Sequence, residues 1–274
     1  MTQHSPSFQE ACRSEPVGNG VYERTLDEHF WGHDAQFGGY AHALVVAAMT
    51  AEIDDIDLAP MSMSMHFMRP FVAGEFRCAV TLVRRGRTMA NVHASVWSAG
   101  KLAAQAIATF ARRRAVGAFV AAVPPPELAS PVFASEASRD PQMGIPTHRL
   151  FEFWPRVGSS AERRADQNRV GGWVRMRDEP VVDELTLVMI NDIWVPVAYH
   201  LSAFGHVAVS ADITTQFRAS MPAAIAPGEP VFVQLRTAVS AGGFVDEDTE
   251  VWSASGELLC QGRQMRYVHD TRDR

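Results

Sequence analysis

The chain reads VWSAGKLAAQ at residues 96–105 and carries a close variant, VWSASGELLCQ, at residues 251–261. In both places Val-Trp-Ser-Ala is followed by a short polar turn, a leucine and a glutamine, which are Gln105 and Gln261. Each segment has the pattern of a strand, a tight turn and a second strand. A hairpin that occurs twice predicts that the chain is built from two related halves.

The first half begins with GYAHALVVAAMTAEID (39–54), whose hydrophobic residues recur at helical spacing. Residues 61–69, MSMSMHFMR, alternate methionine with smaller or polar residues, which predicts a strand. Short turns separate the next segments, so further strands are expected at residues 75–84, 88–98 and 101–112. The first half is therefore expected to be a long helix followed by an antiparallel sheet.

The second half repeats this order, with a leading strand at residues 171–178 and an apolar helix at residues 183–201. Its later strands are expected at residues 208–218, 230–239, 244–254 and 257–268. Equivalent residues keep a nearly constant separation, which is 150 residues for Phe67 and Phe217. The matching order predicts an α+β fold in which a curved sheet covers one helix in each half.

The same comparison predicts the domain boundaries. We expect a frayed N-terminus at residues 1–16, an N-terminal unit at 17–114 and a C-terminal unit at 147–270. Between them, residues 115–146 are rich in proline, alanine and serine, which is typical of an extended linker.

Composition excludes several classes of function. The chain has 274 residues, 47% hydrophobic and 20% charged, as expected for a globular protein with a substantial core. Its net charge of −6 offers no basic surface for nucleic acid or an anionic membrane. No apolar run reaches the ~18 residues that span a bilayer, and the N-terminal residues do not resemble a signal peptide. The scattered Cys12, Cys78 and Cys260 indicate neither disulfides nor a zinc site, so a cytoplasmic location is expected.

Several segments, in this order, resemble the thioesterase II (TesB-type) family of acyl-CoA thioesterases over about residues 17–270. They are WGHDAQFGGYAHAL (31–44), MSMSMHFMRPFVAGE (61–75), VRRGRTMANVHASVWSAGKLAAQAIATF (83–110), INDIWVPVAYH (190–200), VSADITTQFR (209–218) and LLCQGRQMRY (258–267). Proteins of this family contain two hotdog folds in one chain. The resemblance therefore implies a double hotdog that hydrolyses acyl-CoA thioesters.

The resemblance also implies catalytic positions. The family's aspartate falls on Asp192, its glutamine on Gln261 and its threonine on Ser210. Serine departs from the family pattern because it lacks the methyl group that restricts a threonine side chain. A carboxylate that accepts a proton from water suits thioester hydrolysis, and an amide and a hydroxyl can orient the same water.

Each of these residues also has a structural explanation. Asp192 lies in an apolar helical pattern before Pro196, where the helix either kinks or gives way to a short helix capped by Asp192. Ser210 suits the solvent face of a strand, and Gln261 suits an amide that satisfies backbone groups at a sheet edge. The pattern alone leaves these alternatives open.

Two further groups are candidates for substrate binding. Gly38 and Gly39 precede the first helix, where they let a substrate approach the free backbone N–H groups of a helix N-terminus, or they simply serve a turn. Arg84, Arg85 and Arg87 flank a glycine in a hairpin and either bind the phosphates of coenzyme A or form a solvated turn.

The duplication predicts a pseudo-twofold pair of sites of which one has lost its acid. The position that matches Asp192 falls near Gly38, where no carboxylate stands, whereas Gln105 is retained. The leading hypothesis is hydrolysis of a fatty acyl-CoA in fatty acid metabolism, without a cofactor or metal. A catalytically weak acyl-CoA binding protein and an enoyl-CoA hydratase are the alternatives, although no histidine adjoins Asp192 as such a hydratase requires. The resemblance further implies a homo-oligomer.

Overall fold

The computed structural model describes residues 7–26, 28–114, 117, 119–129, 144–158, 168–201 and 206–270. The N-terminus differs from the prediction within its described part, because helix α1 (Phe8–Cys12) begins at residue 8. Ser7 and Glu10 form a capping box, and Phe8 and Cys12 are buried in the core. Of the predicted linker, residues 115, 116, 118 and 130–143 lie outside the described residues.

The N-terminal half follows the predicted order, with a leading strand pair that the sequence patterns did not indicate. Its elements are β1 (Glu15–Gly18), β2 (Val21–Leu26), α2 (Gly38–Ile53), β3 (Ala59–Phe67), β4 (Gly74–Arg85), β5 (Met89–Ser98) and β6 (Lys101–Ala111).

The C-terminal half repeats these elements but breaks its helix. They are η1 (Pro126–Ala129), η2 (Pro146–Leu150), β7 (Phe151–Val157), β8 (Arg169–Met176), α3 (Glu184–Ile193), α4 (Ala198–Leu201), β9 (His206–Phe217), β10 (Val231–Arg236), β11 (Ser240–Ala241), β12 (Phe244–Trp252) and β13 (Leu258–Asp270). The predicted helix over residues 183–201 is therefore wrong in its middle. It ends at Ile193, and Trp194 is extended, because Pro196 cannot donate the next helical hydrogen bond. Asp192 lies in the last turn of α3 rather than at a helix start.

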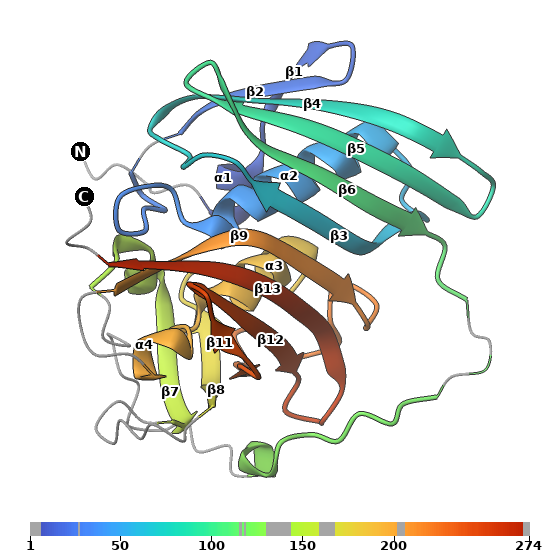
Figure 1. Ribbon diagram of the computed structural model, residues 1–274. Helices are drawn as coiled ribbons and strands as arrows, with labels where there is room; N and C mark the ends of the chain where they lie inside the picture. The colour runs from blue at the N-terminus through green and yellow to red at the C-terminus, as the bar shows by residue number, and fades with distance from the viewer. Residues whose placement is uncertain are drawn as a thin grey trace, which may run out of the picture.

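All strands join one thirteen-stranded antiparallel sheet in the order β1-β2-β4-β5-β6-β3-β9-β13-β12-β10-β8-β7, with β11 beside β12. Read from its centre, the order β3-β6-β5-β4-β2-β1 on one side matches β9-β13-β12-β10-β8-β7 on the other. Figure 1 shows the two halves, blue to green and yellow to red, meeting where β3 and β9 lie side by side. This arrangement agrees with the predicted α+β double hotdog.

The strand register defines the pseudo-twofold axis. Ser64 pairs with Thr214 across the β3–β9 seam, and their hydroxyl groups are 2.9 Å apart. These residues are separated by the same 150 positions as the predicted equivalents Phe67 and Phe217, so equivalent positions meet on the axis. The repeated phrase keeps its irregularity as well, since the register shifts after Val96 and after Val251.

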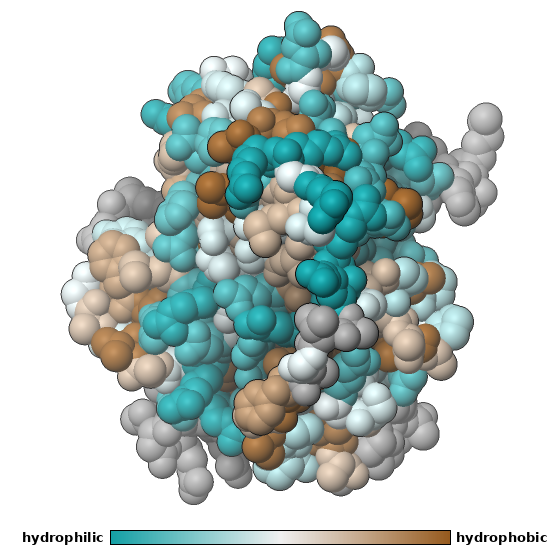
Figure 2. All heavy atoms as spheres, turned by 90° about the vertical axis from the view of Figure 1, so that its right-hand side faces the viewer, coloured by the Kyte–Doolittle hydropathy of each residue, from teal (hydrophilic) through white to brown (hydrophobic). Residues whose placement is uncertain are grey.

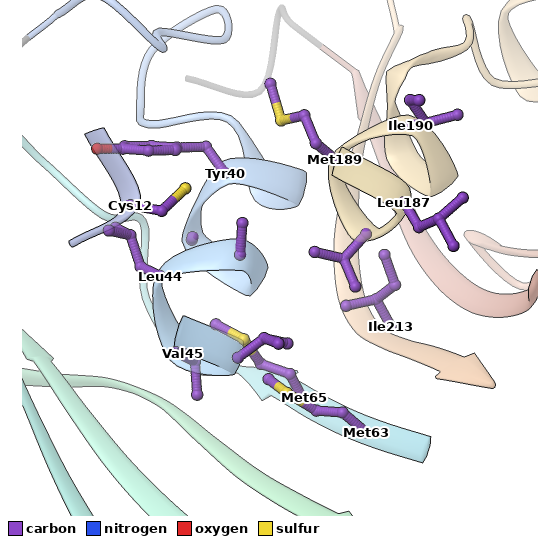
Figure 3. Packing of buried hydrophobic residues seen from close by; sticks show 14 of the residues in the cluster. Cys12, Tyr40, Leu44, Val45, Met63, Met65, Leu187, Met189, Ile190 and Ile213 are labelled. Carbon is purple, nitrogen blue, oxygen red and sulfur yellow. The ribbon is translucent and has the colours of Figure 1, made fainter. Parts of the chain in front are cut away.

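Helices α2 and α3 pack against each other on the concave side of the sheet. The first residues of α2 meet the last turn of α3, because a Cβ at Gly39 would lie 3.1 Å from the Met189 carbonyl oxygen. The two helices therefore run antiparallel. Figure 3 shows Tyr40 and Leu44 on the side of α2 that faces Cys12 of α1, while Met189 projects from α3 on the other side of α2 and Met63 and Met65 of β3 lie below α2.

A close approach at Gly262 seats the last turn of α3 on β13. A Cβ at Gly262 would lie 2.0 Å from the side-chain oxygen of Asn191, so only glycine leaves room for this side chain. The Asn191 amide donates to the Thr215 hydroxyl on β9 at 3.1 Å. These contacts fix the position of the neighbouring residue, Asp192.

We expect Gly262→Ala to lower the free energy of unfolding by about 1–3 kcal/mol, because the added methyl group overpacks the Asn191 contact. Chemical denaturation of the variant measures this loss. Gly86→Ala is the matched control, since its Cβ would meet only a backbone oxygen at 3.3 Å. Equal stability of both variants would contradict the packing argument.

Candidate active site

A cavity of about 660 Å³ opens where the two halves meet, at the start of α2 and the end of α3. The β3–α2 side contributes Phe37, Gly38, Phe67 and Phe71, and the second half contributes Asp192, Trp194, Ser210 and Arg266, among others. Most of the wall is therefore apolar, with a small polar group at one end.

No helix in the described part of the chain is long and apolar enough to cross a membrane.

Asp192 is the carboxylate at the polar end of this cavity, and it is only 5% exposed. Its Oδ1 accepts hydrogen bonds from Gln264 Nε2 and from Arg266 Nη2, each at 2.9 Å. Its Oδ2 points toward Gly38, where a Cβ would come within 2.7 Å. One carboxylate oxygen is thus fully engaged by donors, while the other faces the start of α2.

Arg266 joins this aspartate to a second buried carboxylate. Its Nε donates to Glu247 Oε2 at 2.7 Å, and the other oxygen of Glu247 accepts from Val197 N at 3.1 Å. Burial by itself lowers the pKa of Arg266, but Glu247 and Asp192 outweigh it and raise that pKa above its ordinary value. The guanidinium is therefore a permanent positive charge between two carboxylates.

Ser210 lies beside the same group, as the sequence predicts. Its hydroxyl donates to Gln264 Oε1 at 3.0 Å and lies 3.3 Å from Arg266 Nη1. Because the Gln264 carbonyl accepts from Ser210, its amide nitrogen turns toward Asp192. Serine supplies this hydrogen bond without the methyl group of a threonine.

The structure does not bring Gln261 to this site. Gln261 accepts from Arg218 Nε at 2.9 Å and donates to Glu250 at 3.4 Å, on the outer face of the sheet. Gln264 takes the predicted place beside Asp192. The two glutamines are three residues apart on β13, so they project to opposite faces about 10 Å apart along the strand.

Strand alternation was the signal that distinguishes the two glutamines. Cys260, Gly262, Gln264 and Arg266 are all buried, whereas Arg263 and Met265 between them are exposed. Cys260 is apolar and therefore marks the buried face of the strand. Every second residue from Cys260 lies on that face, which includes Gln264 and excludes Gln261. Gln105 follows the same rule in the first half, where it pairs with His66 and Ser95.

Gly38 lines the cavity in the first turn of α2, whereas Gly39, the next residue of that turn, is not among the lining residues. The helix begins after Phe37, which has no side-chain hydrogen bond to the helix N-terminus. First-turn N–H groups have no acceptor within their own helix, so they are available to an anionic group in the cavity. The absent side chain at Gly38 also admits Asp192 Oδ2.

The three hairpin arginines lie at the other end of α2. Arg85 donates to the Ile53 carbonyl at 2.7 Å and pairs with Asp55, so it caps the C-terminus of the helix. A helix of this length separates its ends by roughly 24 Å, and Arg84, Arg85 and Arg87 do not line the cavity. Their predicted substrate contact is therefore not supported. Figure 2 shows the side of the molecule toward which the β4–β5 turn points, with hydrophilic and hydrophobic residues interspersed.

The first half has apolar residues at the positions equivalent to the charged group. Alignment of the two repeats by their helix starts and strand registers gives four pairs of equivalent positions. They are Val46 and Asp192, Val92 and Glu247, Ala108 and Gln264, and Phe110 and Arg266. The predicted equivalence of Asp192 and Gly38 is therefore wrong. Gly38 begins α2 and is equivalent to Glu184, which begins α3, whereas Asp192 lies near the end of α3. All four first-half residues are buried and apolar, so this network belongs to one half.

His148 of η2 is a cavity residue that the sequence patterns did not indicate. Its Nε2 lies 3.0 Å from the Ile193 carbonyl oxygen at the end of α3, and its ring packs on Phe153. The interaction holds the chain immediately after Asp192. It depends on a segment 45 residues away, so no local pattern reveals it.

Comparisons with known proteins decide the family. Residues 28–111 match the model of the acyl-CoA thioesterase N-terminal domain, and residues 125–268 match that of the C-terminal domain. The chain belongs to the acyl-CoA thioesterase family. This thioesterase is a thioester hydrolase with two hotdog repeats, as the sequence resemblance implies. No curated protein sequence matches it significantly.

Solved structures with the same fold cover nearly the whole thioesterase. One, described as a conserved protein of unknown function with a hot dog fold from Alicyclobacillus acidocaldarius, has a TM-score of 0.83 at 21% identity and covers 97% of this chain and 99% of its own. The tesB protein of Mycobacterium avium subspecies paratuberculosis has a TM-score of 0.72 at 18% identity, with 96% and 98% covered. Acyl-CoA thioesterase II TesB2 of Mycobacterium marinum has a TM-score of 0.73 at 14% identity, with 97% and 98% covered. These similarities establish the double hotdog fold.

The two glutamines give a direct test of the geometry in this thioesterase. We expect Gln264→Ala to lower kcat about 10²-fold, because the carboxylate of Asp192 loses one of its fixed donors. Gln261→Ala is the matched control on the same strand and should stay close to wild type. Release of free thiol from acyl-CoA measures both, and a larger loss in the Gln261 variant would contradict the assignment.

Proposed function

We propose that this thioesterase hydrolyses a fatty acyl-CoA by means of a water molecule activated by Asp192. The observation that carries the proposal is the state of the Asp192 carboxylate. One oxygen is held by Gln264 and Arg266, and the other faces an apolar cavity at the uncapped N-terminus of α2. The same cavity therefore contains the proposed base, Asp192, the proposed site for the carbonyl oxygen at the start of α2, and an apolar wall for the acyl chain.

Asp192 acts as the general base in this proposal. The buried group contains two carboxylates, Asp192 and Glu247, and one guanidinium, Arg266, so it carries one more negative than positive charge. This excess negative charge favours uptake of a proton from water by the free Oδ2. Gln264 and Ser210 keep the carboxylate and the attacking water in a fixed orientation.

The start of α2 receives the charge that forms during attack. The water oxygen adds to the thioester carbonyl carbon while its proton passes to Asp192, and the carbonyl oxygen becomes an oxyanion. The N–H groups at the start of α2, where Gly38 lines the cavity, stabilise this charge together with the helix dipole. Collapse of the intermediate breaks the C–S bond, and the coenzyme A thiolate takes up the proton that Asp192 holds.

The apolar walls suit the acyl chain. Phe67 and Phe71 from the first half and Trp194 and Val195 from the second half line the cavity beside the polar group. Burial of methylene groups against such a surface contributes about 0.8 kcal/mol each. A fatty acyl group therefore fits better than a short polar one.

The geometry does not favour the hydratase alternative, which needs an Asp–His pair that acts on the substrate together. His148 shares the cavity with Asp192, but its Nε2 is engaged with the Ile193 carbonyl. A cytoplasmic location, a role in fatty acid metabolism and a homo-oligomeric state remain predictions based on the sequence and the family resemblance.

Replacement of the base tests the proposal. We expect Asp192→Asn to lower kcat about 10³-fold for every acyl-CoA tested, with KM changed little, because the amide cannot accept a proton. Thiol release and free fatty acid should fall together. Wild type without thiol release above background would support the binding-protein alternative, and near-wild-type turnover by the Asn variant would remove Asp192 from the mechanism.

The hydroxyl at position 210 makes a separate prediction. Ser210→Ala should lower kcat about tenfold, the equivalent of one lost hydrogen bond to Gln264. Ser210→Thr keeps this hydroxyl and should retain most of the activity. If alanine and threonine cost the same, the residue contributes through size and not through its hydroxyl group.

A further inference from the structure

Glu247 of β12 is a buried carboxylate that the proposed chemistry leaves without a role. Its side chain is 0% exposed and does not line the cavity. Charged side chains are almost never fully buried unless they are paired. The partners of Glu247 are Arg266 Nε at 2.7 Å and Val197 N at 3.1 Å.

Through Arg266, Glu247 orients the donors of the site. The guanidinium uses its three nitrogens in three directions, Nε toward Glu247, Nη2 toward Asp192 and Nη1 toward Ser210. The planar group cannot rotate without breaking all of these contacts. Glu247 therefore fixes the plane in which Arg266 meets Asp192.

Glu247 also holds the chain that follows the broken helix. Val197 N lies just beyond Pro196, where the helical hydrogen-bond pattern is interrupted, and the carboxylate accepts from it. The same side chain thus ties Arg266 to the segment that leads out of α3. Val92 occupies the equivalent place in the first half, where the helix is unbroken and Phe110 stands at the position of Arg266.

We propose that Glu247 is a positioning residue that keeps Arg266 from neutralising Asp192, so that the aspartate remains an effective base. The inference rests on the proposed function of Asp192. With Glu247 ionised, Arg266 is shared between two carboxylates. Without that charge, Arg266 and Asp192 form a closed ion pair, which holds the aspartate in its ionised form and weakens it as a proton acceptor.

Several titratable groups lie around Asp192 and must be distinguished from Glu247 in a pH profile. The cavity is also lined by His33, Asp34, His148, Tyr199 and Tyr267. Helix α2 carries His42, which is fully buried and neutral because burial lowers its pKa to about 3. None of these groups changes when Glu247 is replaced, so a displaced pH profile reports on the Glu247 charge.

The test is the pH dependence of kcat for Glu247→Gln, which keeps the size and removes the charge. We expect kcat at its plateau to fall about tenfold, part of the roughly 10²–10⁴-fold effect of general base catalysis. The acidic limb should move to lower pH by about one unit, because protonation of Asp192 would now leave Arg266 unpaired. KM should change little.

Glu152→Gln is the matched control, since Glu152 also bridges two arginines, Arg175 and Arg177, in the same half but outside the cavity. It should lower stability without moving the pH profile. An unmoved acidic limb in a folded Glu247→Gln variant overturns the proposal. So does a limb that moves equally in the Glu152 variant.

Glu247→Asp covers the case in which the glutamine variant does not fold. It keeps the charge but shortens the reach to Arg266, so kcat per folded molecule should fall at least threefold at unchanged KM. Wild-type kcat in this variant overturns the positioning role. Asp192→Asn separates the two levels of inference: if it is active, the proposed function fails, and if it is inactive while the Glu247 variants behave as wild type, only the role of Glu247 fails.

Discussion

The antiparallel pairing of β3 with β9 is the constraint from which the site follows. It joins the two repeats into one sheet about a pseudo-twofold axis near Ser64 and Thr214. The same axis sets α2 and α3 antiparallel, which brings the N-terminus of one helix to the C-terminus of the other. Neither repeat alone contains both Gly38 and Asp192, so the duplication creates a site that a single repeat lacks.

Burial of the polar group is costly, and the asymmetry between the halves reflects that cost. A buried carboxylate needs partners, and a pair of buried charges often contributes less to stability than apolar residues of similar volume. The first half has the apolar solution, with Val46, Val92, Ala108 and Phe110 at the equivalent positions. The second half has Asp192 and its partners instead, which agrees with the catalytic role proposed for Asp192.

The sequence predicts the repeat and its strands because both depend on local patterns. Period-two alternation and the repeated hairpin identify strands β3 to β6 and strands β9, β10, β12 and β13, but not the two-residue β11. The site is harder to predict, because the family resemblance points to Gln261 whereas Gln264 is the glutamine on the buried face of β13. Partners set by tertiary structure, such as Arg85 at the end of α2 or His148 at Ile193, have no local signal. Patterns along one strand define faces, and only the fold defines which residues share a cavity.

The two helix starts differ in whether a side chain caps them. At α3, Asp183 accepts from the backbone N–H groups of Leu185 and Thr186, and Gln9 of α1 donates to the same carboxylate. At α2, the residue before the helix is Phe37, which has no side-chain hydrogen bond to the helix. At the start of α3, the side chain of Asp183 already occupies backbone N–H groups that could otherwise bind an oxyanion. At the start of α2, beside Asp192, no side-chain cap occupies the first N–H groups. The two halves therefore differ at both the proposed base and the proposed anion site, and both features belong to the same cavity.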